Sequence, residues 1–191
     1  MLKYYAGIGS RDTPGHILRI MSMIGSYLGN NGWTLRSGGA QGADSAFEEG
    51  ADQVNAPKEI YLPWRGYNGH SSNLNPKNYP FSGEELDFSA KFHPKWNKLS
   101  PSVRLLMARN TRILAGMKEI HGPLVRQSTM IICWTKDGLI QGGTGQALRI
   151  AKAFEDTSHF KVINLGKAKS PEELGQMVQG LEIYADTSKS N

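Results

Sequence analysis

A glycine-rich segment at residues 37–44, with the sequence SGGAQGAD, constrains the fold of this chain more than any other feature. It lies between an apolar strand pattern at residues 33–37 and an apolar helix pattern at residues 42–50. A strand that ends in glycines and leads into a helix lets backbone N–H groups approach an anion closely, and the helix dipole adds partial positive charge there. We therefore predict a phosphate site at this turn. Its predicted contacts are Ser37, Gly38, Gly39, Ala40, Gly42 and Asp44.

Two of these residues also have simpler explanations. Gly42 fits close packing of the helix, and Asp44 fits a partner of the helix dipole.

A second glycine cluster repeats the arrangement at residues 141–145, with the sequence QGGTG. It lies between a strand pattern at residues 129–134 and a helix that begins near Thr144. Neither cluster has the spacing of a dinucleotide fingerprint, and no Gly-Lys-Ser/Thr follows, so a Walker-type ATPase is not expected. Two such turns predict a phosphorylated ligand held from two sides. The predicted contacts of the second turn are Gly142, Gly143, Thr144 and Gly145.

Strand and helix patterns alternate along most of the chain, which favours a parallel sheet with helices on both faces. The predicted strands cover residues 4–8, 33–37, 58–62, 129–134 and 161–165. With 191 residues, 39% of them hydrophobic, the chain can bury one sizeable core. We predict one Rossmann-like α/β domain at residues 1–185, built on an open parallel sheet of about five or more strands, and a flexible tail at 186–191.

The alternation breaks over residues 64–100, where Pro, Gly, Asn and aromatic residues occur without clear periodicity. We predict a long insertion loop there, because segments of this length without their own pattern are usually functional or mobile in a compact domain. Trp64 is a candidate for flanking a nucleotide base. Packing of the loop against the domain is the more frequent role of such aromatic residues.

The charge and the cysteine content limit which binding partners and which cellular compartment are expected. The 22 basic and 17 acidic residues give a net charge of +5, which permits an anionic partner without requiring one. Cys133 is the single cysteine, so no disulfide forms within the chain, and its apolar neighbours predict a core residue. The five histidines show no ligand spacing, so we predict no metal site, and we expect no cofactor. No apolar run approaches the roughly 20 residues of a membrane span, and we expect a cytoplasmic protein.

Ligands of an open parallel sheet bind beyond the carboxyl ends of its strands, and several polar residues are predicted to meet there. Arg11 follows the first strand, while Arg109 and Arg112 belong to the apolar helix that precedes the fourth. A guanidinium can bind phosphate through two donors, although a solvated turn or helix face also explains each of these arginines. The other predicted contacts at this edge are Gly9, Ser10, Asn110 and Trp134, the last of them as a flank for the base.

Three motifs in this order resemble the signatures of the DprA/Smf DNA-processing family. They are IGSR at residues 8–11, SGGAQGAD at 37–44 and RNTRILAGM at 109–117, and the similarity covers residues 6–165 apart from the 64–100 segment. The resemblance implies an extended Rossmann-like domain that binds single-stranded DNA, with Arg11, Arg109 and Arg112 as phosphate contacts. The wider superfamily, SLOG, joins this family with the LOG phosphoribohydrolases and includes domains that hold nucleotide-derived signals, and a copy of this size resembles proteins encoded by bacteriophages.

The LOG branch carries the motif Pro-Gly-Gly-x-Gly-Thr-x-x-Glu, whose glutamate serves hydrolysis of a nucleoside monophosphate. In this chain Arg149 stands at the position of that glutamate. Because a guanidinium stays protonated and cannot replace a carboxylate in acid–base catalysis, LOG-type cleavage is not expected.

The leading hypothesis is therefore a protein that binds a nucleotide, a cyclic nucleotide or an ADP-ribose-like signal, and that sequesters a host immune signal if it is a phage product. One alternative is single-stranded DNA binding in recombination. Another is N-glycosidic or phosphoester hydrolysis with Asp44, Glu48 or Asp137 as the carboxylate. A homo-oligomer is expected, because related folds commonly pair through helices.

Overall fold

A computed structural model describes residues 3–122, 126–155 and 160–187 as a single parallel sheet flanked by helices. The five strands lie in the order β3-β2-β1-β4-β5, and each pairs in parallel with its neighbours. This arrangement confirms the predicted α/β class and its open parallel sheet. The strand bounds are β1 Lys3–Gly7, β2 Trp33–Ser37, β3 Lys58–Ile60, β4 Met130–Cys133 and β5 Lys161–Asn164.

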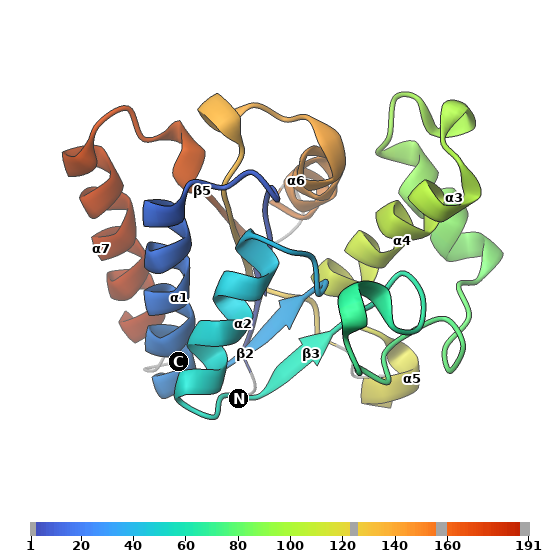
Figure 1. Cartoon of the computed structure of the whole chain (residues 1–191), viewed down its shortest axis with the longest axis horizontal. Coiled ribbons are helices and arrows are strands. Elements are labelled where there is room, and N and C mark those ends of the chain that lie inside the picture. The colour runs from blue at the N-terminus through green and yellow to red at the C-terminus, as the bar shows by residue number, and fades with distance from the viewer. Residues whose placement is uncertain (1–2, 123–125, 156–159, 188–191) are drawn as a thin grey trace.

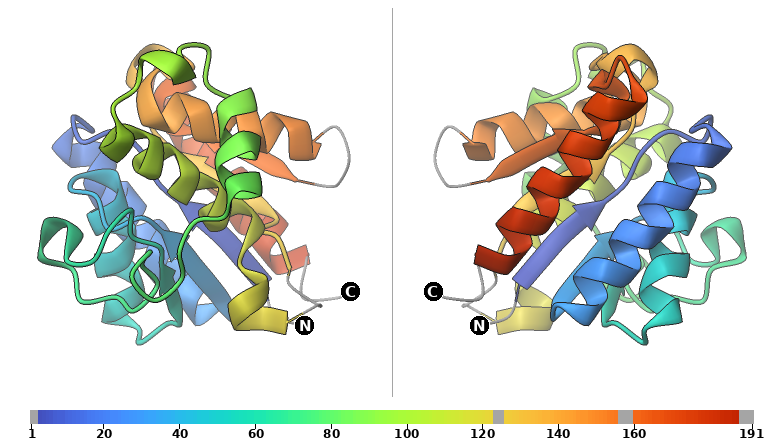
Figure 2. Two further views of the ribbon diagram at one scale, coloured as in Figure 1. Left: turned by 90° about the vertical axis from the view of Figure 1, so that its right-hand side faces the viewer. Right: turned by 90° about the vertical axis from the view of Figure 1, so that its left-hand side faces the viewer.

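The helices form a layer on each face of the sheet (Figures 1 and 2). One face carries α1 (Gly15–Asn30), α2 (Ala43–Gln53) and α7 (Pro171–Thr187). The other carries α4 (Pro101–Ala115) and α6 (Gly142–Glu155), with α3 (Gly83–Lys91) packed outside α4. Right-handed crossovers explain this division, because the chain moves from β1 towards β3 first and then crosses back to β4 and β5. The direction reverses beside β1, so the carboxyl ends of β1 and β4 form the switch point of the sheet.

The core consists of two apolar layers, one on each side of the sheet. Strands β2 and β4 are buried along their whole length, as expected for parallel strands covered on both faces. Met21 of α1 and Phe47 of α2 lie in one layer, and Ile113 of α4 and Ala147 of α6 lie in the other. Cys133 is fully buried at the end of β4, in agreement with its predicted place in the core.

Helices α1 and α2 pack closely because small residues face each other between them. A Cβ atom on Gly50 would overlap with the backbone carbonyl of Ser22, so only glycine fits at this position. The hydroxyl of Ser26 donates to the Gly50 carbonyl oxygen at 2.8 Å. This contact fixes the position of α2, and therefore of the glycine-rich turn that precedes it.

The 64–100 segment differs from the predicted loop, since it contains helix α3 and two short 3₁₀ turns, Tyr67–Gly69 and Trp96–Lys98. Helix α3 begins with a capping box in which Ser82 accepts from the Glu85 amide and the Glu85 carboxylate accepts from the Ser82 amide. The Ser-x-x-Glu spacing was available in the sequence. A short helix α5, Lys118–His121, also escaped prediction.

The sequence led us to expect neither a membrane span nor a metal site. Within the described ranges, no helix combines the length and apolarity needed to cross a membrane. The same ranges hold no group of three or more His, Cys, Asp or Glu side chains arranged to bind a metal ion.

Candidate functional site

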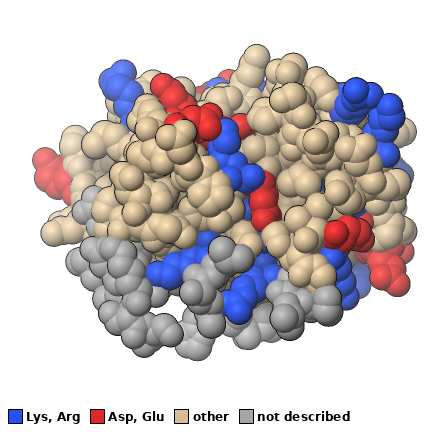
Figure 3. Space-filling view, turned by 90° about the horizontal axis from the view of Figure 1, so that it is seen from below, with Lys and Arg blue, Asp and Glu red and all other residues tan. Residues whose placement is uncertain are grey.

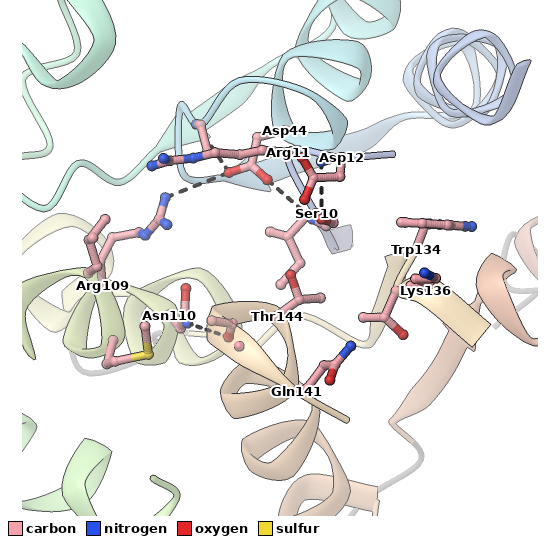
Figure 4. Close-up of a pocket in the computed structure, with 18 of the residues that line it drawn as sticks. Ser10, Arg11, Asp12, Asp44, Arg109, Asn110, Trp134, Lys136, Gln141 and Thr144 are labelled. Atoms are coloured by element: carbon pink, nitrogen blue, oxygen red, sulfur yellow. Dashed lines mark hydrogen bonds and ion pairs between the residues drawn. The ribbon is translucent and has the colours of Figure 1, made fainter. Parts of the chain in front are cut away.

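A cleft of about 930 Å³ opens at the carboxyl edge of the sheet, at the switch point beside β1 and β4 (Figure 4). Its walls come from the loop after β1, the first glycine turn, the middle of α4, and the segment from the end of β4 to the start of α6, with Tyr67 beside them. Both glycine turns therefore approach one cleft from the same edge of the sheet, because their strands run parallel. This is the arrangement that the order of the motifs predicted.

Eleven of the predicted contact residues line this cleft, and seven lie outside its lining. The lining includes Gly9, Ser10, Arg11, Ala40, Asp44, Arg109, Asn110, Trp134, Gly142, Gly143 and Thr144. The seven outside are Ser37, Gly38, Gly39, Gly42, Trp64, Arg112 and Gly145.

The first glycine turn holds a carboxylate of the protein itself. Asp44 is 2% exposed, and one of its oxygens accepts from the Gly38 amide at 3.2 Å and the Ala40 amide at 3.3 Å. Its other oxygen accepts from the Gly9 amide at 3.2 Å. The amides predicted to bind a ligand phosphate are therefore occupied by Asp44, and an anion could use them only by displacing this side chain.

Arg109 completes this buried group from the opposite side of the turn. Its Nη1 lies 3.6 Å from an Asp44 oxygen and donates a hydrogen bond to the Gly38 carbonyl oxygen. A Cβ atom on Gly38 would overlap with the same nitrogen, which explains the glycine there. Arg109 thus holds the turn and the carboxylate together, although its buried Nε has no hydrogen-bond partner among the described residues.

The remaining glycines of the first turn serve local packing. Gly42 has a φ of +84°, and a Cβ atom there would lie 2.9 Å from backbone atoms of Ser10 and Arg11. The close approach of the two loops therefore requires glycine. Ser37 donates its hydroxyl to the Gly7 carbonyl oxygen at 2.7 Å, and the Gly39 carbonyl accepts from Asn68 at 2.9 Å.

Burial dominates the electrostatics of the Asp44–Arg109 pair. Burial raises the pKa of Asp44 to about 6, against the opposing influence of Arg109 and the turn amides. Burial also lowers the pKa of Arg109, which the Asp44 carboxylate partly offsets. Both shifts follow from the cost of taking a charged group out of water.

The raised pKa of Asp44 predicts a pH-dependent contribution to stability. The folded protein binds more protons than the unfolded chain between the unfolded pKa of 3.8 and the folded value of about 6. The contribution is thus fully present below pH 3.8 and is lost as the pH rises through 6. Relative to Asp44→Asn, the wild-type free energy of unfolding should fall by on the order of 3 kcal/mol from pH 4 to pH 7. Urea unfolding at several pH values measures this difference, and a flat difference would contradict the assignment.

The second glycine turn presents backbone donors to the cleft. Gly142, Gly143 and Thr144 form the first turn of α6, and within the described ranges their amides have no hydrogen-bond acceptor. Asn110 steadies this turn by donating to the Gly143 carbonyl oxygen at 3.1 Å. Gly145 lies behind it, where a Cβ atom would come within 2.6 Å of the Ile140 carbonyl carbon.

Two exposed cations stand at the rim of the cleft. Arg11 donates from Nη2 to the Tyr67 hydroxyl at 2.7 Å, so the aromatic side chain orients the guanidinium. Lys136 follows β4 and also lines the cleft (Figure 4). Neither Tyr67 nor Lys136 was among the predicted contacts. The available signal was that each lies in a segment that follows a strand of the parallel sheet.

Arg112 lies away from the cleft, although only three residues separate it from Arg109. It is 3% exposed, binds both carboxylate oxygens of Glu85 at 2.6 and 2.8 Å, and donates to the carbonyls of Tyr79 and Pro80. Its guanidinium also lies 4.0 Å from the centre of the Phe81 ring. These contacts attach the 79–85 segment to α4 and leave no donor directed at the cleft.

Trp64 and Arg149 also have structural partners. Trp64 packs edge-on against Tyr67, with 5.0 Å between ring centres, in line with the packing alternative. Arg149 donates to the carbonyls of Phe92 at 2.6 Å and Ile140 at 3.4 Å, and it does not line the cleft.

Comparison with known proteins adds no family assignment. No family model, no curated protein and no solved structure matches the chain. The resemblance to the DprA/Smf family is thus carried by the three sequence motifs alone, and each of them reaches the lining of one cleft.

Proposed function

We propose that the cleft binds a phosphorylated, nucleotide-derived ligand. The observation that carries this proposal is the amino end of α6. The amides of residues 142–144 have no acceptor in the described part of the chain, and these residues line a large cleft at the switch point of the sheet. A helix of 14 residues directs a positive partial charge to that end, where a phosphate accepts hydrogen bonds from the amides. The phosphate thus binds at residues 142–144 and not at the first glycine turn, which Asp44 fills.

The other walls suit the rest of a nucleotide. Arg11 and Lys136 place two cations at the rim, where a second phosphate or a ribose hydroxyl lies within reach. Trp134 and Met107 provide apolar surface for a base. The volume of about 930 Å³ is near the upper end of the range for small-molecule sites, about 300–1,000 Å³. A ligand of the size of ADP-ribose fills that volume better than a mononucleotide does.

The residues support binding without LOG-type cleavage. Arg149, at the position of the LOG glutamate, is turned towards backbone carbonyls outside the cleft. Glu48 lies outside the lining as well, with a carboxylate oxygen 2.8 Å from His70 Nε2. A protein that holds its ligand intact suits the role of sequestering a nucleotide signal.

One observation favours a second candidate, hydrolysis of the bound nucleotide. Asp44 lines the cleft with its pKa raised to about 6, and such shifts are common in catalytic acids. Asp137 is the other proposed carboxylate at the cleft and is exposed. Chromatography of the nucleotides after long incubation separates the candidates, because binding alone returns the ligand unchanged.

Isothermal titration with mono-, di- and cyclic nucleotides and ADP-ribose tests the binding proposal. For the ligand that binds best, Arg11→Ala and Lys136→Ala should each weaken the affinity about 10- to 100-fold, since a hydrogen bond to a charged group contributes about 1.5–3 kcal/mol. Lys98→Ala removes an exposed cation outside the lining and should leave the affinity unchanged.

Absence of heat with every nucleotide would reject the proposal. The DNA alternative then gains support if oligo-dT shifts in a gel at low salt and the complex weakens steeply as salt is added. Seen from below, on the side away from the cleft, several Lys and Arg side chains gather on one face of the molecule (Figure 3). Substitutions at the cleft would leave DNA binding at that face intact.

A further inference from the structure

An apolar groove of about 770 Å³ runs between α1 and α7, on the face of the sheet opposite α4 and α6. Figure 2 shows β1 in the gap between these two helices. Met23 of α1 is 71% exposed at the groove, the most exposed of the large hydrophobic side chains in the described part of the chain. The residues lining the groove are His16, Ile20, Met23, Ile24, Tyr27, Pro171, Leu174, Gly175, Val178, Gln179 and Leu181.

The two helices that flank the groove carry opposite charge beside its uncharged lining. Arg19 is the only Lys, Arg, Asp or Glu of α1, and His16 lies one turn before it. Every charged residue in the sequence of α7 is acidic, and Glu172 and Glu173 lie exposed in its first turn. Each helix follows a strand of the parallel sheet, so both begin at the carboxyl edge and run in the same direction. The basic and acidic residues therefore stand at the same end of the groove.

We propose that this face pairs with a second copy of the chain, about a twofold axis that runs along the groove. Such an axis exchanges the two walls, so that α1 of each copy packs on α7 of the other. Met23 then enters the partner's apolar wall of Leu174 and Val178. Arg19 of each copy meets Glu172 and Glu173 of the partner subunit.

Charge complementarity favours a second copy of the chain as the partner at this groove, and it also favours a twofold axis that runs along the groove. A twofold axis across the groove would pack α1 antiparallel against α1 of the partner, and Arg19 would then find no acidic residue on the helix opposite it, because α1 contains no Asp or Glu. The axis along the groove instead forms two identical basic–acidic contacts. One chain supplies both halves of this pattern, and a second copy is therefore the partner that satisfies it without further assumptions.

The mass in solution tests this proposal. Light scattering with size-exclusion chromatography should give twice the 21.0 kDa of one chain. Met23→Glu should weaken dimerisation at least tenfold, because it buries a charge in the partner's apolar wall. Arg19→Glu should weaken it several-fold, and Arg19→Glu combined with Glu172→Arg and Glu173→Arg should restore it. Lys152→Glu, at an exposed position of α6, is the matched control and should leave the dimer intact.

Circular dichroism melting separates loss of pairing from loss of folding, since Met23 and Arg19 are exposed in the single chain. A monomer at all concentrations, a dimer that resists Met23→Glu or Arg19→Glu, or a failure of the reversed pair to restore the dimer would each overturn the proposal. The groove lies on a different face from the α6 terminus. The outcome is therefore independent of ligand binding in the cleft.

Discussion

Arg109→Ala is expected to lower the free energy of unfolding by about 3–5 kcal/mol, because it leaves the Asp44 carboxylate buried without its cation. The substitution also removes the donor to the Gly38 carbonyl, which fixes the first glycine turn. Denaturant unfolding at pH 7 measures the loss. Lys152→Ala, an exposed residue of α6, should change the free energy of unfolding by less than about 0.5 kcal/mol.

A double-mutant cycle distinguishes the pair from general loss of packing. Asp44→Asn combined with Arg109→Met removes both charges and should cost less than the two single substitutions added together. A cycle in which the two costs simply add would contradict the coupling assigned to this pair. In that case Arg109 would act through packing alone.

Gly50→Ala is expected to destabilise the protein by about 3 kcal/mol, at the upper end of the cost of overpacking. The added methyl group would overlap with the Ser22 carbonyl, and this atom belongs to the α1 backbone, which cannot rotate away. Helix α2 would have to move, and the turn that holds Asp44 would move with it. Thermal unfolding of the variant measures the cost.

Gly180→Ala provides the matched control for this substitution. Gly180 lies in α7 with no heavy atom within 4 Å of the position of an added Cβ. Alanine should raise the free energy of unfolding there by roughly 0.5–1 kcal/mol, because it favours the helix. If Gly50→Ala is as well tolerated as Gly180→Ala, the close contact between α1 and α2 does not limit stability.

The sheet was accessible from the sequence because its signals are local. Residues 130–133 form an uninterrupted apolar run, which is typical of a strand buried on both faces, and the structure places β4 there. The predicted strand bounds differ from the observed ones by at most two residues, and those of β2 are identical. The common edge of the two glycine turns also followed, since parallel strands all end on the same side.

The contacts of the two arginines of α4 could not be predicted from the sequence in the same way. Arg109 and Arg112 lie within one turn of α4, yet the first reaches Asp44 and the cleft while the second binds Glu85. Helical spacing places them on neighbouring faces but does not show which segment covers each face. The covering segment for Arg112 belongs to residues 64–100, whose weak periodicity gave no position for it.

The order of strands and helices, the parallel sheet, and the edge at which both glycine turns emerge could all be predicted from the sequence, because they depend on apolar periodicity and on turn residues close together in the chain. The folded structure was needed to show that Asp44 fills the first turn and that the amides of the second turn have no acceptor among the described residues. A glycine turn offers its donors to any acceptor that reaches it. At the first turn this acceptor is Asp44, which lies beside Arg109, a cation that folding brings from 71 residues away to donate to Gly38.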